Sequence, residues 1–449
     1  MTTTQNTRLV CFPPICLDTV SEQELQAYFT NTWEMYEVLF SAILPPEVYY
    51  EQPDPLRNPL IFYYGHTAAF YINKLRLANL LKEGINPRFE ELFAKGVDPD
   101  SPQNLPTREL WASFEEVKAY RRQVFECVSK VIAETPFALP ITENAPFWAL
   151  LMSIEHDRIH FETSSLLIRQ LPKLFLQRPD SWQYARSLGN PPKNKLISVQ
   201  GGTVTIGKPK DSNIYGWDNE YGTLEVKVNP FEATQNLISN AEFLIFVQDG
   251  GYENSSFWTE EGWHWKTDTD THYPKFWVKE GQDFRYRAMF DEWEMPLDFP
   301  VEVNALEAQA YCAWKGAAWR LLSEAEFHLI GASQLATKED VVFSDKYNLS
   351  VLYGSPTPVG FMQSGQDESL FHDLFGNVWD WLQNDFYPLP QFEIHDWYDD
   401  FSLPYFDNEH SMMIGGSWAS SGTSASKYYR LWFRRNFFQH AGFRLAKNL

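Results

Sequence analysis

Apolar and polar positions recur with the period of an α-helix along the first 170 residues of the chain. Start signals support two of these stretches: Ser21 and Glu24 form a Ser-x-x-Glu capping box, and Pro59 stands where proline commonly begins a helix. We therefore expect four long helices, the number that a four-helix bundle needs. Their expected ranges are 21–44, 59–81, 114–134 and 145–169.

The pattern changes after Leu171, where Pro172, Pro179, Pro191 and Pro192 interrupt the chain. Short strand-like runs follow, separated by loops rich in Gly, Asn, Asp and aromatic residues, and helical spacing becomes sparse. We expect an α+β protein of two domains: an N-terminal arm (1–20), a bundle (21–172), a linker (173–195) and an irregular second domain (196–449). Within that domain we expect strands at 196–205, 224–229 and 412–418, and helices at 239–248 and 304–315.

Composition narrows the class of protein. The chain has 449 residues, 44% of them hydrophobic and 21% charged, which is typical of a globular protein of two or three domains. A net charge of -22 argues against nucleic acid and anionic membranes as partners. Neither an apolar signal-peptide core nor a long membrane-spanning run is visible, so we expect a cytoplasmic protein.

The four cysteines, at positions 11, 16, 127 and 312, match no zinc spacing and no disulfide framework. We interpret them as reduced thiols. Cys11 and Cys16 are an alternative metal-binding pair, but Pro13 and Pro14 between them favour an extended arm.

His156 and His160 are the strongest chemical signal. Four residues apart on a helix, their rings share one face, with β-carbons roughly 6 Å apart. Such a pair can bind a transition metal, and His66, inside the strongly apolar second helix, would supply a third nitrogen. Three neutral imidazoles leave open coordination positions, as catalysis requires. The alternative for each histidine is a hydrogen-bonded core residue.

Glu162 looks like a further ligand, but it lies about 200° round the helix from His160 and should point away from the metal. Asp157 and Arg158 are expected on a solvated or interdomain face.

At these residues the sequence resembles a known family. His156-x-x-x-His160-x-Glu162, with His66 upstream, is similar to the iron-binding motif of the ergothioneine- and ovothiol-pathway sulfoxide synthases. The resemblance implies a DinB-like four-helix bundle with an Fe(2+) site, followed by a formylglycine-generating-enzyme-like domain with a C-type-lectin-like fold. Motifs similar to that second domain follow in order at residues 201–207, 320–327, 375–381, 415–418 and 441–444.

Within the family the chain looks most similar to the ovothiol branch, through residues 60–66, 85–89, 162–172, 215–222 and 437–444. Ergothioneine-type members often carry Gln before the second histidine of the pair, and here that residue is Ile159. Ovothiol-type members commonly add a C-terminal methyltransferase domain, whereas this sequence ends at Leu449, so we expect a separate methyltransferase as a pathway partner.

The implied reaction couples L-cysteine to L-histidine with O2 and gives 5-histidylcysteine sulfoxide. The alternative is an ergothioneine- or selenoneine-type synthase that acts on N-trimethylhistidine (hercynine). A rival from another class is a metal-free binding module in which both domains are scaffolds.

In this family a tyrosine of the second domain donates a proton or hydrogen atom near the bound oxygen. Matching the downstream proline at Pro404 selects Tyr398 as this catalytic residue. Trp397, Tyr387 and Tyr405 are alternatives, and plain packing is the other explanation for any single tyrosine in a chain with 16% aromatic residues.

Both substrates are zwitterions, and arginine suits a carboxylate because its fork binds bidentately. Arg434, Arg435 and Asn436 occupy the region where the family binds the thiol substrate, with Gln439 as a weaker candidate. A structural salt bridge is the alternative for either arginine, and the sequence does not choose between them.

Overall fold

The computed structural model describes residues 8–94, 107–334, 345–363, 365 and 370–449. Its N-terminal part is helical, as the apolar spacing predicts. The capping box is present: Ser21 Oγ accepts a hydrogen bond from the Glu24 amide, and the Glu24 carboxylate accepts one from the Ser21 amide. The helices of this part are α1 (Glu22–Ser41), α2 (Leu60–Leu77), α3 (Pro87–Leu92), α4 (Phe114–Glu134) and α5 (Pro146–Arg169).

The four long helices form a closed bundle, because α1 and α2 each pack against both α4 and α5. Helices α2 and α5 are buried nearly all round, as expected for helices at the centre of a protein. Helix α5 also contacts the 3₁₀ helix η8 (Gly422–Ala425), so its other side lies against the second domain.

The second domain has short strands and few helices. Two four-stranded sheets have the strand orders β1-β4-β13-β8 and β11-β10-β9-β12, and a β2-β3 hairpin and a β5-β6-β7 meander complete it. Its helices are α6 (Asn240–Gln248), α7 (Glu260–Asp268), α8 (Ala305–Lys315) and α9 (Glu324–Gln334). Its strands are β1 (Leu196–Val199), β2 (Gly202–Ile206), β3 (Leu224–Val228), β4 (Phe231–Thr234), β5 (Trp277–Glu280), β6 (Asp283–Arg287), β7 (Glu292–Glu294), β8 (Arg320–Leu321), β9 (Trp379–Asp385), β10 (His410–Ile414), β11 (Leu431–Arg434), β12 (Ala441–Gly442) and β13 (Leu445–Asn448).

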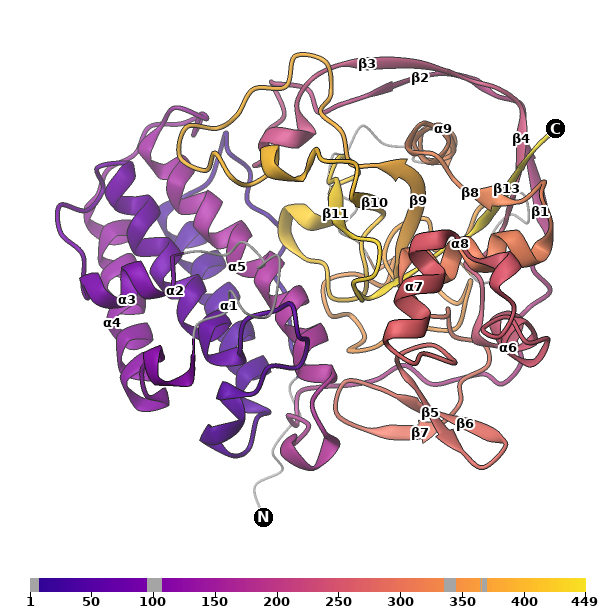
Figure 1. Cartoon of the computed structure of the whole chain (residues 1–449). Coiled ribbons are helices and arrows are strands. Elements are labelled where there is room, and N and C mark those ends of the chain that lie inside the picture. Colours follow the sequence, from indigo (N-terminus) through magenta and orange to yellow (C-terminus); the bar gives the residue numbers. More distant parts are fainter. Residues whose placement is uncertain (1–7, 95–106, 335–344, 364, 366–369) are drawn as a thin grey trace.

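Figure 1 shows the bundle and the second domain side by side, with α5 on the bundle side that faces β9–β11. The last strand, β13, pairs with β4 and β8, so the C-terminal end of the chain closes a sheet begun by the domain's first strands. The fold class predicted from the sequence, an α+β protein with a helical bundle followed by an irregular second domain, is confirmed.

One expected strand is divided in the structure. Residues 196–205 form β1 and β2, which belong to different sheets, because Gly201 and Gly202 turn the chain between them. Gly201 has φ +71°, a left-handed conformation that only glycine adopts without strain. The stretch predicted as one strand is therefore two short strands, one on each side of the glycine turn.

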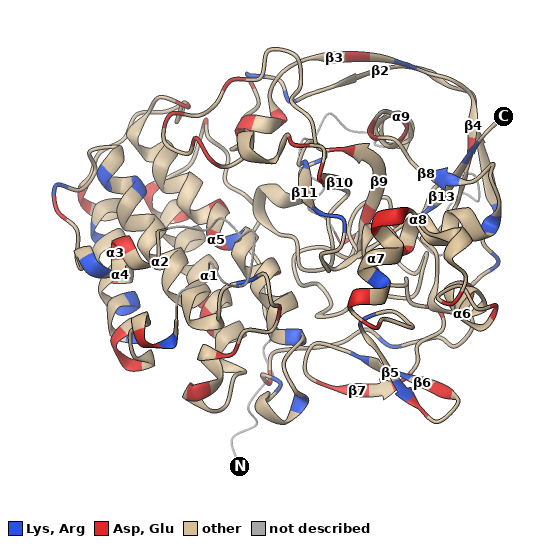
Figure 2. Cartoon of the chain, in the orientation of Figure 1, with Lys and Arg blue, Asp and Glu red and all other residues tan. Residues whose placement is uncertain are grey.

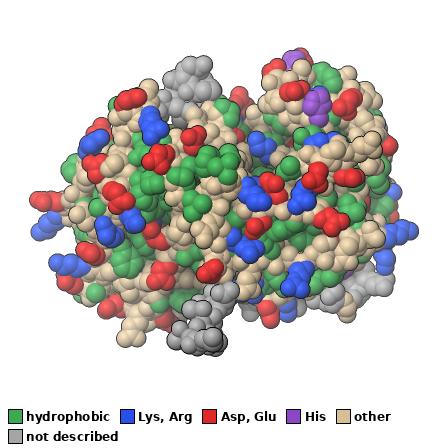
Figure 3. Space-filling model, turned by 90° about the horizontal axis from the view of Figure 1, so that it is seen from below, with side chains coloured by type: hydrophobic (Ala, Val, Ile, Leu, Met, Phe, Trp, Pro, Cys, Tyr) green, Lys and Arg blue, Asp and Glu red, His purple; other side chains and the backbone are tan. Residues whose placement is uncertain are grey.

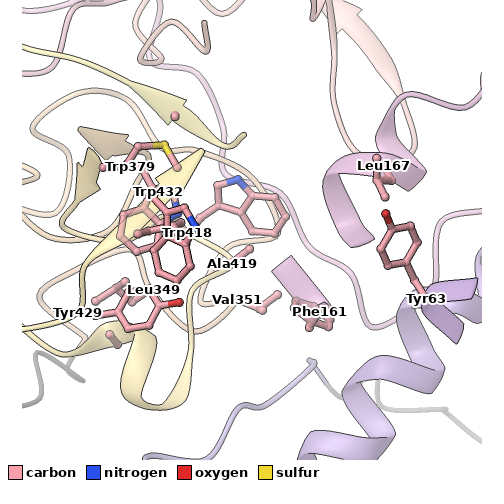
Figure 4. Close-up of a cluster of buried hydrophobic side chains, with 14 of the residues drawn as sticks. Tyr63, Phe161, Leu167, Leu349, Val351, Trp379, Trp418, Ala419, Tyr429 and Trp432 are labelled. Atoms are coloured by element: carbon pink, nitrogen blue, oxygen red, sulfur yellow. The ribbon is translucent and has the colours of Figure 1, made fainter. Parts of the chain in front are cut away.

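Aromatic rings build the core that joins the two domains. Phe161 of α5 lies 6.4 Å from Trp182, ring centre to ring centre, and Trp182 lies 5.8 Å from Trp418 of the second domain. Figure 4 shows Phe161 next to the cluster that contains Trp379 and Trp418. Some of the many aromatic residues of the sequence therefore pack at the domain interface.

Charged residues are distributed over both domains. Figure 2 shows acidic and basic positions on the bundle and on the second domain alike, and the face in Figure 3 interleaves both signs with apolar side chains. Among the described residues no helix has the length and apolar character needed to cross a membrane.

Candidate metal centre

Three histidine rings meet in the bundle where α2 faces α5. The Nε2 atom of His156 lies 3.3 Å from Nε2 of His66 and 3.1 Å from Nε2 of His160. Nitrogens that bind one metal ion at about 2.0–2.1 Å and at right angles to one another lie about 3 Å apart. Both distances have the spacing of neighbouring ligands on one metal ion, and the ligand atoms of all three histidines lie within 4.8 Å of one another, forming the cluster of potential metal ligands found in the described part of the chain.

The His66 ring is oriented by a backbone carbonyl group, that of Phe93. Its Nδ1 lies 2.6 Å from the carbonyl oxygen of Phe93, so Nδ1 carries the proton and Nε2 turns its lone pair to the other two rings. Gly65 makes this approach possible, because a β-carbon there would lie 2.7 Å from the Phe93 ring. The residue before the first histidine thus controls how the histidine points.

All three rings are held neutral, which is the form that binds metal. Burial lowers the pKa of His66 to about 4, although the Phe93 carbonyl opposes this shift. Burial and then the neighbouring histidines lower the pKa of His156 well below its usual value, and burial does the same for His160. Converging lone pairs on neutral rings repel one another, and a bound cation would relieve this repulsion. The residues present therefore fit a divalent metal ion.

The opposite side of α5 carries polar groups of a different kind. Glu162 is buried and accepts hydrogen bonds from Trp379 Nε1 at 2.6 Å, Ser417 Oγ at 2.5 Å and Ser420 Oγ at 2.7 Å. All three donors belong to the second domain. The expectation that Glu162 points away from the metal is confirmed, and its carboxylate fastens α5 to the second domain.

Glu155, seven residues earlier, has a matching role. It accepts hydrogen bonds from Tyr28 Oη at 2.6 Å and from the backbone amide and hydroxyl of Thr423, both at 2.8 Å. Gly422 allows this contact: its φ is +60°, and a β-carbon there would lie 2.4 Å from Glu155 Oε2. The domain interface therefore requires glycine at position 422.

Arg169, seven residues after Glu162, completes the series. Its guanidinium binds both oxygens of Glu302, at 2.5 and 2.8 Å, and donates to the carbonyl oxygen of Arg287. Residues seven apart on a helix drift by only about 20°, so Glu155, Glu162 and Arg169 form one stripe. We call these three residues the docking stripe.

Asp157 and Arg158 are not on a solvated face. Both are buried, with 0% and 2% of their surface exposed. Arg158 donates a hydrogen bond to Cys11 Sγ at 2.8 Å and lies over the ring of Tyr28. The solvated alternative was wrong. Asp157 lies inside the bundle beside Tyr71, whereas Arg158 lies next to Gly422 of the second domain, as the interdomain alternative expected.

A cavity of about 300 Å³ opens beside the histidines, between the bundle and the second domain. Of the three histidines His160 is on its wall, so the histidine cluster borders this space. Aromatic and cationic side chains dominate the lining, which consists of Arg57, Phe70, Asn73, Lys74, Ala94, Ile159, His160, Thr163, Tyr398, Asp400, Phe401, Tyr405, His410, Tyr429, Leu431, Trp432, Phe433, Arg434 and Phe437.

Tyr398 lines this cavity, and its ring centre lies 6.0 Å from that of His156. Its neighbour Trp397 and the alternative Tyr387 are not on the wall; the Tyr387 hydroxyl donates to Glu324 instead. Tyr405 is on the wall and lies 5.1 Å from His410, ring centre to ring centre. The structure thus brings the tyrosine selected from the sequence close to the histidine cluster.

The neighbouring residues Arg434 and Arg435 lie in different surroundings. Arg434 lines the cavity, with its guanidinium 5.8 Å from the ring centre of Phe437. Arg435 does not line it, and its guanidinium binds Asp385 at 2.6 Å and Glu261 at 3.3 Å. Asn436 lines a second hollow on the outer side of Phe437, and Gln439 is buried outside the cavity.

The sequence interpretation missed two cations on the cavity wall, Arg57 and Lys74. Arg57 is buried, donates from Nε to Tyr63 Oη at 3.0 Å, and contributes to lowering the pKa of His160, after burial. Lys74 could have been found: it lies eight residues after His66 on an otherwise apolar helix face.

Comparison with known proteins agrees with this architecture. Residues 184–449 match the Sulfatase-modifying factor enzyme 1-like domain family, and residues 28–164 match the DinB superfamily. The chain is 29% identical to "Hercynine oxygenase" of Mycobacterium tuberculosis, covering 88% of this chain and 92% of that protein. It is 27% identical to "Hercynine oxygenase" of Mycolicibacterium thermoresistibile, covering 88% of each chain.

A fungal relative is longer than this chain. "Ergothioneine biosynthesis protein 1" of Neurospora crassa is 24% identical over 93% of this chain and 57% of its own length. Because the first family match covers more than half of the sequence, this chain belongs to the family with the Sulfatase-modifying factor enzyme 1-like domain, preceded here by a DinB-superfamily bundle.

Proposed function

We propose that this protein is a non-heme iron(II) sulfoxide synthase that joins the sulfur of a cysteine-type thiol to an imidazole carbon of a histidine derivative. The S–H and C–H hydrogens leave as water with one oxygen atom of O2, and the other oxygen atom forms the sulfoxide, so the four electrons balance. The observation that carries the proposal is the facial set of three neutral histidines beside an interdomain cavity.

The chain's own residues would divide the work. His66, His156 and His160 would hold Fe(2+), which when bound supplies O2 activation and a site for the thiolate. Burial and then Asp400 raise the pKa of Tyr398 well above its usual value, so its phenol keeps the proton that it would deliver. Arg434, on the cavity wall, would bind a substrate carboxylate, whereas Arg435 and Asn436 lie outside this wall.

The chain is an oxygen-dependent oxidoreductase by its relationship to hercynine oxygenases. For the imidazole substrate, the relatives' names support hercynine, the acceptor placed second on sequence grounds. The cavity wall is rich in aromatic rings, which suit a trimethylammonium group because such a group cannot donate hydrogen bonds and binds to the faces of aromatic rings. Those rings belong to Phe70, Tyr398, Phe401, Tyr405, Tyr429, Trp432, Phe433 and Phe437.

L-Histidine is the second candidate, and two features of the cavity wall favour it. Ile159, which stands where ergothioneine-type members often carry Gln, is on the cavity wall next to His160. Asn73 and Asp400, on the same wall, could accept hydrogen bonds from a primary ammonium. This candidate is the ovothiol-type reaction implied by the sequence resemblance.

A competition experiment tests the proposal. The iron(II)-loaded protein is given cysteine, O2 and an equimolar mixture of hercynine and L-histidine, and the products are identified by mass and NMR. We expect a hercynine sulfoxide at an advantage of about tenfold or more in kcat/KM. Preference for L-histidine would select the second candidate, and the absence of any C–S-bonded product would contradict the proposal.

Tyr398→Phe tests the role of the phenol. We expect the variant to divert thiol oxidation from the sulfoxide to cysteine sulfinate, because proton delivery contributes about 10²-fold or more. Tyr405→Phe, on the same cavity wall, is the matched control and should keep the parent's product ratio. Equal product ratios in Tyr398→Phe and the parent would remove Tyr398 from the mechanism.

A further inference from the structure

Helix α2 carries a line of three side chains from the metal centre to the second domain. His66, Phe70 and Lys74 are spaced four residues apart, so they share one face of the helix. The Phe70 ring stacks on the His156 ring, with ring centres 3.6 Å apart and planes 6° from parallel. Lys74 Nζ lies 4.8 Å from the centre of the Phe70 ring. The line is therefore continuous from a candidate metal ligand to an ammonium group.

The ammonium of Lys74 meets the segment that bears Tyr398. Nζ lies 4.2 Å from the centre of the Tyr398 ring and donates a hydrogen bond to the backbone carbonyl of Trp397, the preceding residue. One cation from the bundle thus contacts both the ring and the backbone of this segment. The Tyr398 ring also lies 5.1 Å from the Phe70 ring in an edge-to-face arrangement.

The same segment is fastened more firmly to its own domain a few residues later. Ser402 Oγ donates to Asp218 at 2.5 Å, and Phe401 stacks on Trp217 with ring centres 4.1 Å apart. These contacts fix the base of the segment, and Phe401 and Trp217 also lie beside the Tyr398 ring, with ring centres 5.2 and 6.2 Å away. Across the interface the ring meets His156 of α5 and both Phe70 and Lys74 of α2, and Lys74 is the one charged group among these neighbours.

The surroundings keep Lys74 in this place. It is half-buried, and burial lowers its pKa to about 8 while Asp400 and Asp399 oppose that shift. A cation that has lost much of its water gains most from aromatic faces and a carbonyl oxygen. The two rings, the Trp397 carbonyl and the nearby carboxylates supply these partners.

We propose that Lys74 is a positioning residue for Tyr398, holding the phenol over the cavity at a fixed distance from the histidine cluster. This inference rests on the proposed function only for the role of Tyr398 in the reaction; the positioning itself concerns the fold. An alternative role for Lys74, direct binding of a substrate carboxylate, follows from its place on the cavity wall and is separated by the experiment.

The first arm of the test needs no iron. 3-Fluorotyrosine is placed at position 398 of the full chain, and its 19F resonance is compared in the parent, Lys74→Met, Lys74→Arg and Lys82→Met. Lys74→Met keeps the length of the side chain without its charge, and Lys82 is an exposed lysine beyond the end of the same helix. We expect a shifted and broadened resonance in Lys74→Met alone. A resonance identical to the parent's in Lys74→Met would overturn the inference.

The second arm uses the iron-loaded enzyme. We expect Lys74→Met to shift products towards sulfinate and to lower kcat for the sulfoxide about tenfold or more, with KM for both amino acids within about twofold of the parent. Lys74→Arg should restore most of the sulfoxide. A large rise in KM that disappears with decarboxylated substrates would make Lys74 a carboxylate anchor and overturn positioning. If Tyr398→Phe leaves products unchanged while the 19F resonance responds to Lys74→Met, the proposed role of Tyr398 fails and the positioning contact stands.

Discussion

The two faces of α5 use polar residues in opposite ways. On the docking stripe, Glu155, Glu162 and Arg169 each have several hydrogen-bond partners in the surrounding protein. On the other face, about 100–180° round the helix from the stripe, the Nδ1 atoms of His156 and His160 have no hydrogen-bond partner among the described residues, and their Nε2 atoms converge.

This difference indicates which face is structural and which is chemical. Buried polar groups are normally satisfied, because leaving one without a partner costs about 1–3 kcal/mol. Satisfied groups on the docking stripe stabilise the domain interface. The Nε2 atoms of His66, His156 and His160 converge on one another, and this convergence indicates a place for a ligand from outside the chain. The same helix therefore ties the domains together and presents the candidate metal ligands near the interface that it creates.

His160→Ala is the change with the largest expected effect, and it acts on the chemical face alone. Iron(II) affinity should fall by about 100-fold or more and turnover should be lost, since a ligand is removed. The free energy of unfolding of the metal-free protein should change by at most about 1 kcal/mol. Iron titration and chemical denaturation measure the two quantities. Loss of stability with unchanged iron affinity would reverse the assignment of the faces.

Arg169→Met acts on the docking stripe. It leaves Glu302 buried without its cation, which should cost about 3–5 kcal/mol of stability at neutral pH. Burial opposes ionisation of Glu302, but Arg169 and His440 lower its pKa to about 2 in the parent. A depressed carboxyl pKa stabilises the fold above the unfolded-state value and this contribution is lost as pH falls towards the folded value.

The stability difference between parent and Arg169→Met should therefore shrink between about pH 4.5 and pH 2, as Glu302 takes up its proton. Denaturation of both proteins across this range measures it. A difference that stays constant with pH would mean that the arginine stabilises the interface by packing rather than by charge.

Glu162→Leu should destabilise the fold by about 3 kcal/mol, because Trp379, Ser417 and Ser420 lose their common acceptor. Glu162→Gln is the matched control: its carbonyl oxygen can still accept two of these bonds, so a loss of about 1 kcal/mol is expected. Iron affinity should stay close to the parent's in Glu162→Gln. A fall in that affinity as large as in His160→Ala would make Glu162 a ligand after all.

Gly422→Ala should disturb the interface less than Arg169→Met or Glu162→Leu, with about 2 kcal/mol of lost stability. The added methyl group would collide with the Glu155 carboxylate, and the alanine backbone would have to adopt a left-handed conformation. Gly250→Ala is a suitable control, since position 250 also has positive φ but open space around it. If the two variants lose equal stability, the cost is backbone strain alone and the contact with Glu155 contributes nothing.

Much of the bundle could be predicted from the sequence. The ranges expected for α4 and α5 agree with the structure to within one residue, because apolar spacing and caps are local signals. The i, i+4 spacing of His156 and His160 is equally local. That His66 joins them depends on helix packing, which spacing does not reveal: its place inside an apolar helix suggested it as the third nitrogen, and the family resemblance implied it.

The second domain was harder to predict, for physical reasons. Its strands are two to seven residues long, too short for a periodic pattern to emerge, and helices α7 and α9 were missed. Arg434 and Arg435 could not be distinguished because consecutive residues at the end of a strand point in opposite directions. Lys74 was overlooked because its partners, the Trp397 carbonyl and the Tyr398 ring, are more than 300 residues away in the sequence.

The most direct test of the account is the location of iron. A crystal structure of the Fe(2+)-loaded protein, with anomalous data collected on both sides of the iron absorption edge, would place the metal. We predict one iron atom bound by the Nε2 atoms of His66, His156 and His160, facing the cavity lined by Tyr398, with the Glu162 carboxylate still bound to Trp379, Ser417 and Ser420. Iron at another position, or iron bound by Glu162, would contradict the account.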